Sequence, residues 1–127
     1  MNIVVDSSVI IDYIRAGVGC LPGLLESAKS GKIKLYVPTA VVLELWSGKS
    51  MNLVKNRQRV NLIFSAMEKI DLTGTIAKQA GALIRHGYVH SGFDSIIAAS
   101  ALELEARLAT GNRRHFDSVK NLKFWSD

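Results

Sequence analysis

The sequence predicts an α/β fold, a three-layer α/β/α sandwich around a central, mostly parallel sheet. Short apolar runs, beginning with Ile3-Val4-Val5, alternate along the chain with segments of helical periodicity. Strands separated by helices pair in parallel through right-handed crossovers, with helices on both faces of the sheet. A hydrophobic content of 48% with only two prolines is typical of a compact globular chain. We expect the 127 residues to form a single domain, residues 1–127.

Glycine, proline and capping residues mark most of the expected element boundaries. Gly17, Gly31 and Gly48 each follow a segment of helical periodicity, where the end of a helix favours glycine. Pro38 ends a strand, and Thr39 is placed to cap the next helix. In chain order, the expected elements are strand 1–6, helix 8–16, helix 21–30, strand 33–37, helix 40–47, helix 52–69, strand 70–72, helix 75–90, helix 93–106, strand 108–110 and strand 122–125.

Composition limits the class of protein. The net charge of +5 attracts polyanions, of which nucleic acid is the natural candidate, although a basic surface kept for solubility explains the charge equally well. Cys20 is the only cysteine, and no Cys/His cluster has zinc-ligand spacing. No basic segment precedes the first apolar residues, and no apolar run approaches the roughly 18 to 20 residues of a membrane span. We therefore expect a cytoplasmic protein without a membrane segment.

Glu44 is the strongest single indication of a functional site. It stands in the apolar segment Val41-Val42-Leu43-Glu44-Leu45-Trp46, and neither residue one helical turn away is basic. A carboxylate among apolar neighbours needs donors or a cation, because burying it alone costs several kcal/mol. The alternative is a side chain that reaches water from the edge of the helix, and we favour the functional interpretation.

Asp6 and Asp94 are two further acids at expected element ends. Asp6 closes the first strand, and in parallel sheets functional groups gather where strands end. Each also has a capping interpretation, Asp6 through Asp6-Ser7-Ser8 and Asp94 through Ser91-Gly92-Phe93-Asp94. Asp94, however, opens the nearly uninterrupted apolar segment that continues to Leu102, which places it at the mouth of the core. Asp12 lies one turn into the first helix, near Arg15, and a solvated position is its simpler interpretation.

If Asp6, Glu44 and Asp94 converge, they require a cation. Unit charges ~5 Å apart at an effective dielectric of ~20 repel by about 3 kcal/mol per pair. A dication offsets that repulsion, and oxygen ligands without thiolates favour Mg²⁺ or Mn²⁺ over zinc. Such an ion activates water and stabilises charge on a phosphodiester oxygen. Hydrolysis of a nucleic-acid backbone is the expected reaction.

The segment after the expected strand 108–110 adds polar and basic candidates. Asn112 follows Thr110-Gly111 and could hold a metal-bound water or the scissile phosphate, although Gly-Asn is also ordinary turn chemistry. Arg113 and Arg114, with His115, could grip the flanking phosphates or form a solvated basic run. Without interleaved aromatic residues, we expect backbone contacts to dominate any binding of RNA.

Four segments together resemble a known family. They are Val4-Val5-Asp6-Ser7-Ser8-Val9-Ile10, Leu43-Glu44-Leu45-Trp46-Ser47-Gly48, Asp94-Ser95-Ile96-Ile97-Ala98-Ala99-Ser100-Ala101 and Ala109-Thr110-Gly111-Asn112-Arg113-Arg114-His115-Phe116. In this order they resemble the PIN domain, and specifically its VapC-type toxins. The resemblance covers nearly the whole chain.

The resemblance implies an Mg²⁺- or Mn²⁺-dependent ribonuclease, usually a homodimer, inhibited by a small cognate antitoxin whose tail occupies the acidic groove. It carries catalysis and metal binding onto Asp6, Glu44 and Asp94, and supporting polar roles onto Ser7, Thr110 and Asn112. Many members have a fourth acid where this chain has Asn112, so one-metal and two-metal mechanisms both stay open.

Two questions remain open in the sequence. A non-catalytic RNA-binding module is the alternative function, since a substituted fourth acid could leave binding without turnover. The apolar ladder of Leu53, Val60, Phe64 and Met67 could form a dimer or antitoxin surface, although core packing is the favoured role for most of these side chains.

Overall fold

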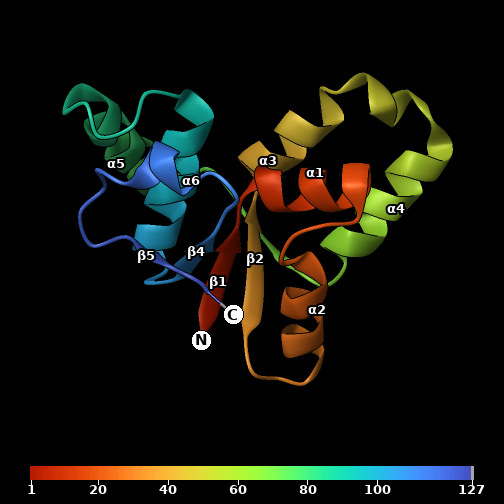
Figure 1. Ribbon diagram of the computed structural model, residues 1–127. Coiled ribbons are helices and arrows are strands. Elements are labelled where there is room, and N and C mark those ends of the chain that lie inside the picture. The colour runs from red at the N-terminus through yellow and green to blue at the C-terminus, as the bar shows by residue number, and fades with distance from the viewer. Residues whose placement is uncertain (127) are drawn as a thin grey trace.

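The computed structural model describes residues 1–126 and has a five-stranded sheet at its centre (Figure 1). The strand order is β3-β2-β1-β4-β5, and every neighbouring pair is parallel. The strands are β1 (Asn2–Val5), β2 (Lys34–Pro38), β3 (Glu68–Ile70), β4 (Arg107–Ala109) and β5 (Lys123–Phe124). The helices are α1 (Ser7–Ala16), α2 (Leu21–Lys29), α3 (Thr39–Trp46), α4 (Val54–Phe64), α5 (Gly74–Arg85) and α6 (Gly92–Glu103), with 3-10 turns η1 (Lys49–Asn52) and η2 (Arg113–Phe116).

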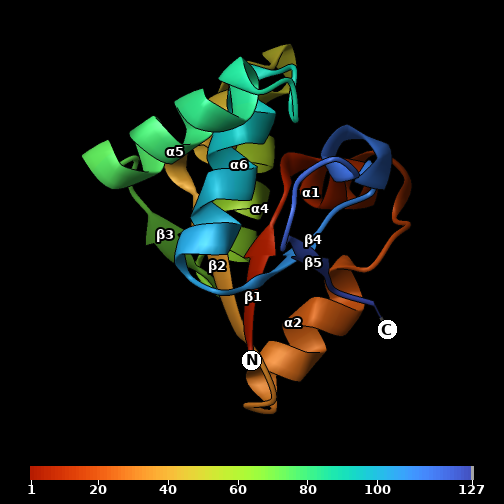
Figure 2. The same cartoon turned by 90° about the vertical axis from the view of Figure 1, so that its left-hand side faces the viewer.

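Helices cover both faces of the sheet, which confirms the three-layer sandwich. In Figures 1 and 2, α5 and α6 lie on one side, and α1, α2 and α4 lie on the other. The consecutive side chains of Ile3, Val4 and Val5 are all fully buried, as expected for a strand enclosed on both faces. The short side chains Ala98, Ala99 and Ala101 are also fully buried, so α6 can approach both the sheet and α5 closely. Because all the strands are parallel, their carboxyl ends lie at one edge of the sheet, where α1 and α3 begin directly after β1 and β2.

The central boundaries differ from those expected. The helix expected over 52–69 is the shorter α4, which η1 precedes, and the strand expected at 70–72 is β3 at Glu68–Ile70. Tyr36 pairs with Glu68 and Pro38 with Ile70, so residues 68–70 form a strand beside β2 and do not continue the helix. Thr39 does not cap α3, because Pro38 occupies the N-cap position and makes no side-chain cap bond.

Two helices end earlier than expected. α5 stops at Arg85 instead of residue 90, because Gly87 adopts a φ of 74° and Tyr88 N–H donates to the Leu83 carbonyl, which closes the helix end. α6 stops at Glu103 instead of residue 106, where Glu105 takes the left-handed position with a φ of 50°. Both terminations turn the chain sharply, and the second leads directly into β4.

The helices within residues 1–126 are short compared with a membrane span. None of these helices alone has the length and apolar character to cross a membrane, and α1 with α2 meets that test only as a pair bent by 111°.

Candidate active site

Asp6 lies at the carboxyl end of β1, where it forms the N-cap of α1. Its side chain is almost completely buried. Oδ1 accepts a hydrogen bond from Ser7 N–H at 2.8 Å, and Oδ2 accepts from the hydroxyls of Ser8 at 2.9 Å and Thr110 at 2.7 Å. The capping interpretation is thus correct for Asp6, and the same carboxylate is also held at the edge of the sheet where a site was expected.

The loop after β4 is tied to Asp6 by the same two hydroxyls. Ser8 Oγ accepts from Gly111 N–H at 2.9 Å, and Thr110 Oγ1 accepts from Asn112 N–H at 2.9 Å. Asp6 N–H also donates to the Ala109 carbonyl at 3.0 Å, which continues the pairing of β1 with β4. The Thr110 side chain therefore contacts Asp6 at the predicted site. Asn112 is exposed, and its contact with Thr110 is made by its backbone N–H.

Glu44 is half-buried on α3. Burial raises the pKa of its carboxyl group above the ordinary value, and repulsion from Asp6 and Asp94 raises it further. A hydrogen bond with the Ser7 side chain acts in the opposite direction and lowers the pKa. The charges of the other two acids therefore act on Glu44, and Ser7, the first residue of α1, is a polar contact from α1 to Glu44 on α3.

Asp94 is half-buried in the first turn of α6. Capping is performed by Ser91, whose Oγ accepts from the backbone N–H of Asp94 at 3.4 Å. The Asp94 carboxylate instead lies 3.2 Å from His115 Nδ1, measured from Oδ2. Burial raises the pKa of Asp94, repulsion from Asp6 raises it further, and His115 lowers it.

Asp6 thus follows β1, Glu44 lies on α3 and Asp94 on α6, and the charge of Asp6 acts on both of the other acids. Within residues 1–126, no group of three His, Cys, Asp or Glu side chains has an arrangement that could hold a metal ion as it stands. The donor set itself fits a hard divalent cation, because it consists of carboxylate and hydroxyl oxygens, and the charge of Asp6 raises the pKa of both Glu44 and Asp94.

The two arginines expected to bind RNA have different surroundings. The guanidinium of Arg113 lies 5.1 Å from the centre of the Phe124 ring and donates to the Trp125 carbonyl at 3.1 Å, so it fastens η2 to the C-terminal strand. Arg114 is exposed and lines a pocket of about 660 Å³ together with His115 and the loop from Thr110. Arg114 is therefore the freer of the two to meet a ligand.

Three contacts of the site involve residues that the sequence pattern did not assign to it. Ser8 bridges Asp6 and Gly111, and its place beside Asp6 and Ser7 was the only available signal. His115 was grouped with a basic run, and its pairing with Asp94 spans distant segments of the chain. Asp12 is exposed as expected, yet its Oδ2 lies only 3.1 Å from where a Cβ at Gly111 would be, so its carboxylate borders this loop.

Comparison with known proteins agrees with this architecture. A family model described as the PIN domain matches residues 3–122. The chain is 30% identical over 126 residues to a protein named Ribonuclease VapC10 from Mycobacterium tuberculosis, covering 95% of this chain and 90% of that protein.

Solved structures share the fold at lower sequence identity. VapBC2 from Rickettsia felis, bound to a DNA fragment from its promoter, gives a TM-score of 0.81 at 22% identity and covers 99% of this chain and 100% of that chain. DNA-bound VapBC from Salmonella typhimurium gives a TM-score of 0.82 at 21% identity and covers 98% of this chain and 97% of that chain. With the sequence match over nearly its whole length, the chain belongs to the PIN domain family, among the relatives of VapC.

Proposed function

We propose that this protein is an endoribonuclease that depends on Mg²⁺ or Mn²⁺ and acts as the toxin of a toxin–antitoxin pair. The observation that carries the proposal is that Asp6, Glu44 and Asp94 come together from three segments of the chain, with the charge of Asp6 raising the pKa of both Glu44 and Asp94. The relative from Mycobacterium tuberculosis is named a ribonuclease, and a solved structure from Klebsiella pneumoniae with a TM-score of 0.72 is described as a toxin–antitoxin complex. Both names support the same assignment.

In the proposed mechanism, Asp6, Glu44 and Asp94 hold the cation, and Ser7, Ser8 and Thr110 orient the carboxylates. Bound there, Mg²⁺ or Mn²⁺ would lower the pKa of a water molecule and stabilise negative charge on the phosphodiester. Asp6 is fixed by three donors, whereas Glu44 and Asp94 are half-buried, with contacts to Ser7 and His115 respectively. Arg114 is placed to bind a flanking phosphate.

The proposed partners follow from the same assignment. RNA is the substrate, a cognate antitoxin is the inhibitor, and the toxin is a homodimer in the cytoplasm. A basic chain of net charge +5 suits association with RNA.

The substitution Asp6→Asn tests the proposal. We expect the wild type to cleave single-stranded RNA when Mn²⁺ is added and to stop when the metal is chelated. Asp6→Asn removes one ligand charge, and we expect at least a hundredfold loss of cleavage rate, the order of effect of a group acting in the transition state. The variant should stay folded, because its amide oxygen can accept from Ser7 N–H while its NH₂ group donates to the oxygens of Ser8 and Thr110, which reverses the direction of those two bonds.

Asp71→Asn is the matched control, because Asp71 also follows a parallel strand but is exposed beside the edge strand β3. It should cleave RNA as the wild type does. RNA binding without cleavage by the wild type in Mn²⁺ would favour the non-catalytic RNA-binding module. An Asp6→Asn protein that fails to fold would instead assign Asp6 a structural capping role.

A further inference from the structure

We propose that a groove beside Glu44 binds the phosphates of the RNA chain on one side of the cleavage point, an inference that rests on the proposed ribonuclease function. The groove has a volume of about 540 Å³ and is lined by residues of α1, α3, η1 and α4. Glu44 belongs to this lining, so the groove opens onto the candidate active site.

The groove has the charge that a phosphate backbone requires. Arg15, Lys49 and Arg59 line it, and Glu44 is its only carboxylate. All three cationic residues are exposed, and none of them belongs to a salt bridge formed within residues 1–126. Their positive charges are thus available to a ligand and, with Glu44 assigned to the metal, face no competing acid in the groove.

Local contacts position two of these cations. The Arg59 guanidinium lies 5.5 Å from the centre of the Tyr13 ring, which holds it beside α1. Lys49 belongs to η1, and this turn is fastened to α4 by bonds from Asn56 to the Ser50 carbonyl at 2.9 Å and from Arg57 to the Met51 carbonyl at 2.6 Å. Arg59 and Lys49 are therefore held in the groove by contacts within the folded structure.

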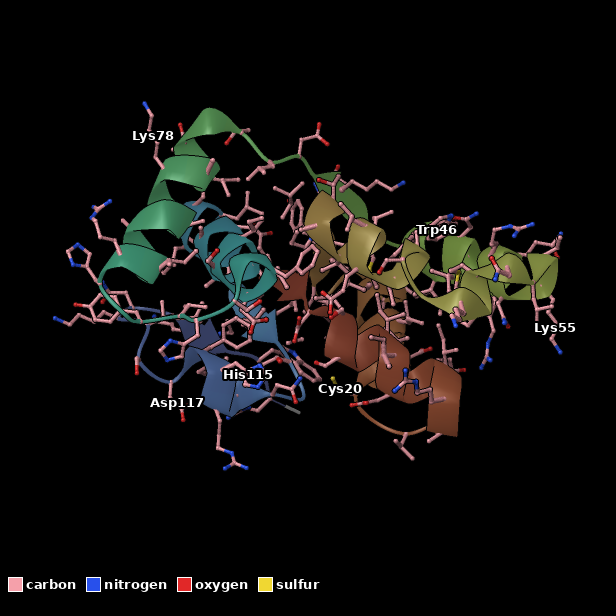
Figure 3. All side chains as sticks on the ribbon, turned by 90° about the horizontal axis from the view of Figure 1, so that it is seen from above. Cys20, Trp46, Lys55, Lys78, His115 and Asp117 are labelled. Carbon is pink, nitrogen blue, oxygen red and sulfur yellow. The ribbon has the colours of Figure 1, made fainter. Side chains whose placement is uncertain are left out.

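The three acids lie between this groove and a second basic pocket. That pocket, of about 660 Å³, is lined by the segment from Thr110 to His115. It touches the site through the bond of Thr110 to Asp6 and the ion pair of His115 with Asp94, whereas Glu44 belongs to the groove. Figure 3 shows His115 on one side of the molecule and Lys55 of α4 on the other, with α1 and α3 between them. A chain that crosses the acids would be bound on both sides, as cleavage within an RNA strand requires.

The basic lining of the groove fits the regularly spaced phosphates of an RNA strand. Contacts from arginine and lysine to phosphates release counterions, and each such contact on single-stranded nucleic acid adds about 0.7 to the slope of log K against log salt. Three contacts should therefore contribute about 2 to that slope. This is a quantity that RNA binding can measure without any cleavage.

The test compares two triple variants by RNA binding in EDTA, where no turnover occurs. The groove variant is Arg15→Gln/Lys49→Gln/Arg59→Gln, and the control, Lys78→Gln/Arg85→Gln/Lys120→Gln, removes the same charge from exposed residues elsewhere. Fluorescence anisotropy with a labelled 12-nucleotide single-stranded RNA would be measured from 0.05 to 0.4 M NaCl. We expect the groove variant to lose about 2 from the salt slope and about 100-fold in affinity at 0.1 M salt, and the control to lose far less.

Equal salt slopes and affinities for the two variants would overturn the inference. So would a deca-glutamate peptide that binds the wild type as tightly as the RNA and loses its binding in the groove variant, since that result would assign the groove to an acidic protein partner. If the triple variant does not fold, Arg15→Gln/Lys49→Gln keeps the Arg59 contact with Tyr13 and should lose about 1.4 from the slope. Wild-type cleavage in Mn²⁺ is measured separately, so a failure of the proposed ribonuclease function is distinguished from a failure of the groove.

Discussion

At the scale of single residues, hydroxyl groups determine which carboxylate of the site is rigid. The hydroxyl groups of Ser8 and Thr110 each have one proton to donate, and both donate it in a hydrogen bond to Asp6 Oδ2. Each hydroxyl also accepts a backbone N–H, from Gly111 and Asn112 respectively, which fixes its orientation. Moving Asp6 would break several bonds worth about 1 kcal/mol each. The Asp6 carboxylate is therefore rigidly held, so the side chains of Glu44 and Asp94 must adopt positions that suit it when a cation binds.

The raised pKa of Glu44 predicts how its charge affects stability. A carboxyl group whose pKa is higher in the folded than in the unfolded state binds more protons when folded, so its contribution to stability falls as pH rises from the ordinary value of 4.5 through the folded pKa. Near pH 7 the ionised side chain is destabilising in the metal-free protein. Glu44→Gln removes this charge, and we expect it to raise the melting temperature at pH 7 in EDTA. The gain should shrink as pH falls toward 4.5.

Glu26→Gln provides the control, because Glu26 is an exposed acid within α2. Its melting temperature should follow that of the wild type at every pH, as substitutions at solvated positions usually do. Thermal unfolding by circular dichroism between pH 4 and pH 8 measures both variants. A Glu44→Gln protein less stable than the wild type at pH 7 would contradict the prediction, because it would mean that favourable contacts of the ionised Glu44 outweigh its burial and its repulsion by the other acids.

At the scale of elements, the sequence indicated what local chemistry dictates and missed what tertiary contacts decide. Buried strands such as β1 and the apolar helix α6 have continuous apolar signals, and the start of each was predicted to within one residue. β3 has the sequence Glu68-Lys69-Ile70, and as an edge strand paired only with β2 it needs little apolar character. The strand was therefore expected two residues too late, at 70–72, and the preceding helix was extended through Glu68 and Lys69.

The same limit applies to the basic candidates of η2. Arg113 and Arg114 are adjacent and chemically identical in the sequence, and only the folded chain brings Phe124 and Trp125 against one of them. The ion pair of His115 with Asp94 likewise joins η2 to α6. Asp6, Glu44 and Asp94 could be proposed individually because each is an acid in an apolar setting or at an element end.

The packing of α6 makes a specific prediction. Ala98 is fully buried in this helix, which contacts β1, β2 and β4. Ala98→Leu adds three carbons where the interior is close-packed, and we expect it to lower the free energy of unfolding by about 1 to 3 kcal/mol. Urea denaturation measures the change. Ala77→Leu, at an exposed position of α5, makes the same substitution without overpacking and should stay within about 0.5 kcal/mol of the wild type. Equal stabilities of the two variants would show that α6 has room to move away from the sheet.

At the scale of the whole molecule, charge of opposite sign is separated into distinct regions. The acids of the site lie where β1, α3 and α6 converge, whereas the groove beside α4 and the pocket beside η2 are basic. The net charge of +5 is thus arranged so that a polyanion is attracted to the flanks while a cation is attracted to the centre. A bound cation should strengthen RNA binding, because without it the acids repel the phosphate that the flanks attract.

Metal binding should therefore stabilise the folded protein, even without RNA. An ion that binds only the folded state adds RT ln(1 + [L]/Kd) to the free energy of unfolding, about 2.7 kcal/mol at one hundred times Kd. For a chain of 127 residues this corresponds to a rise in melting temperature of order 10 °C. We expect Mn²⁺ to produce a rise that depends on its concentration in the wild type and in Asp71→Asn, and a much smaller one in Asp6→Asn. Differential scanning fluorimetry across a Mn²⁺ titration measures all three. A rise of equal size in Asp6→Asn would mean that the ion binds elsewhere, since Asp6 is one of the three acids proposed to hold it and is itself held in place by Ser8 and Thr110.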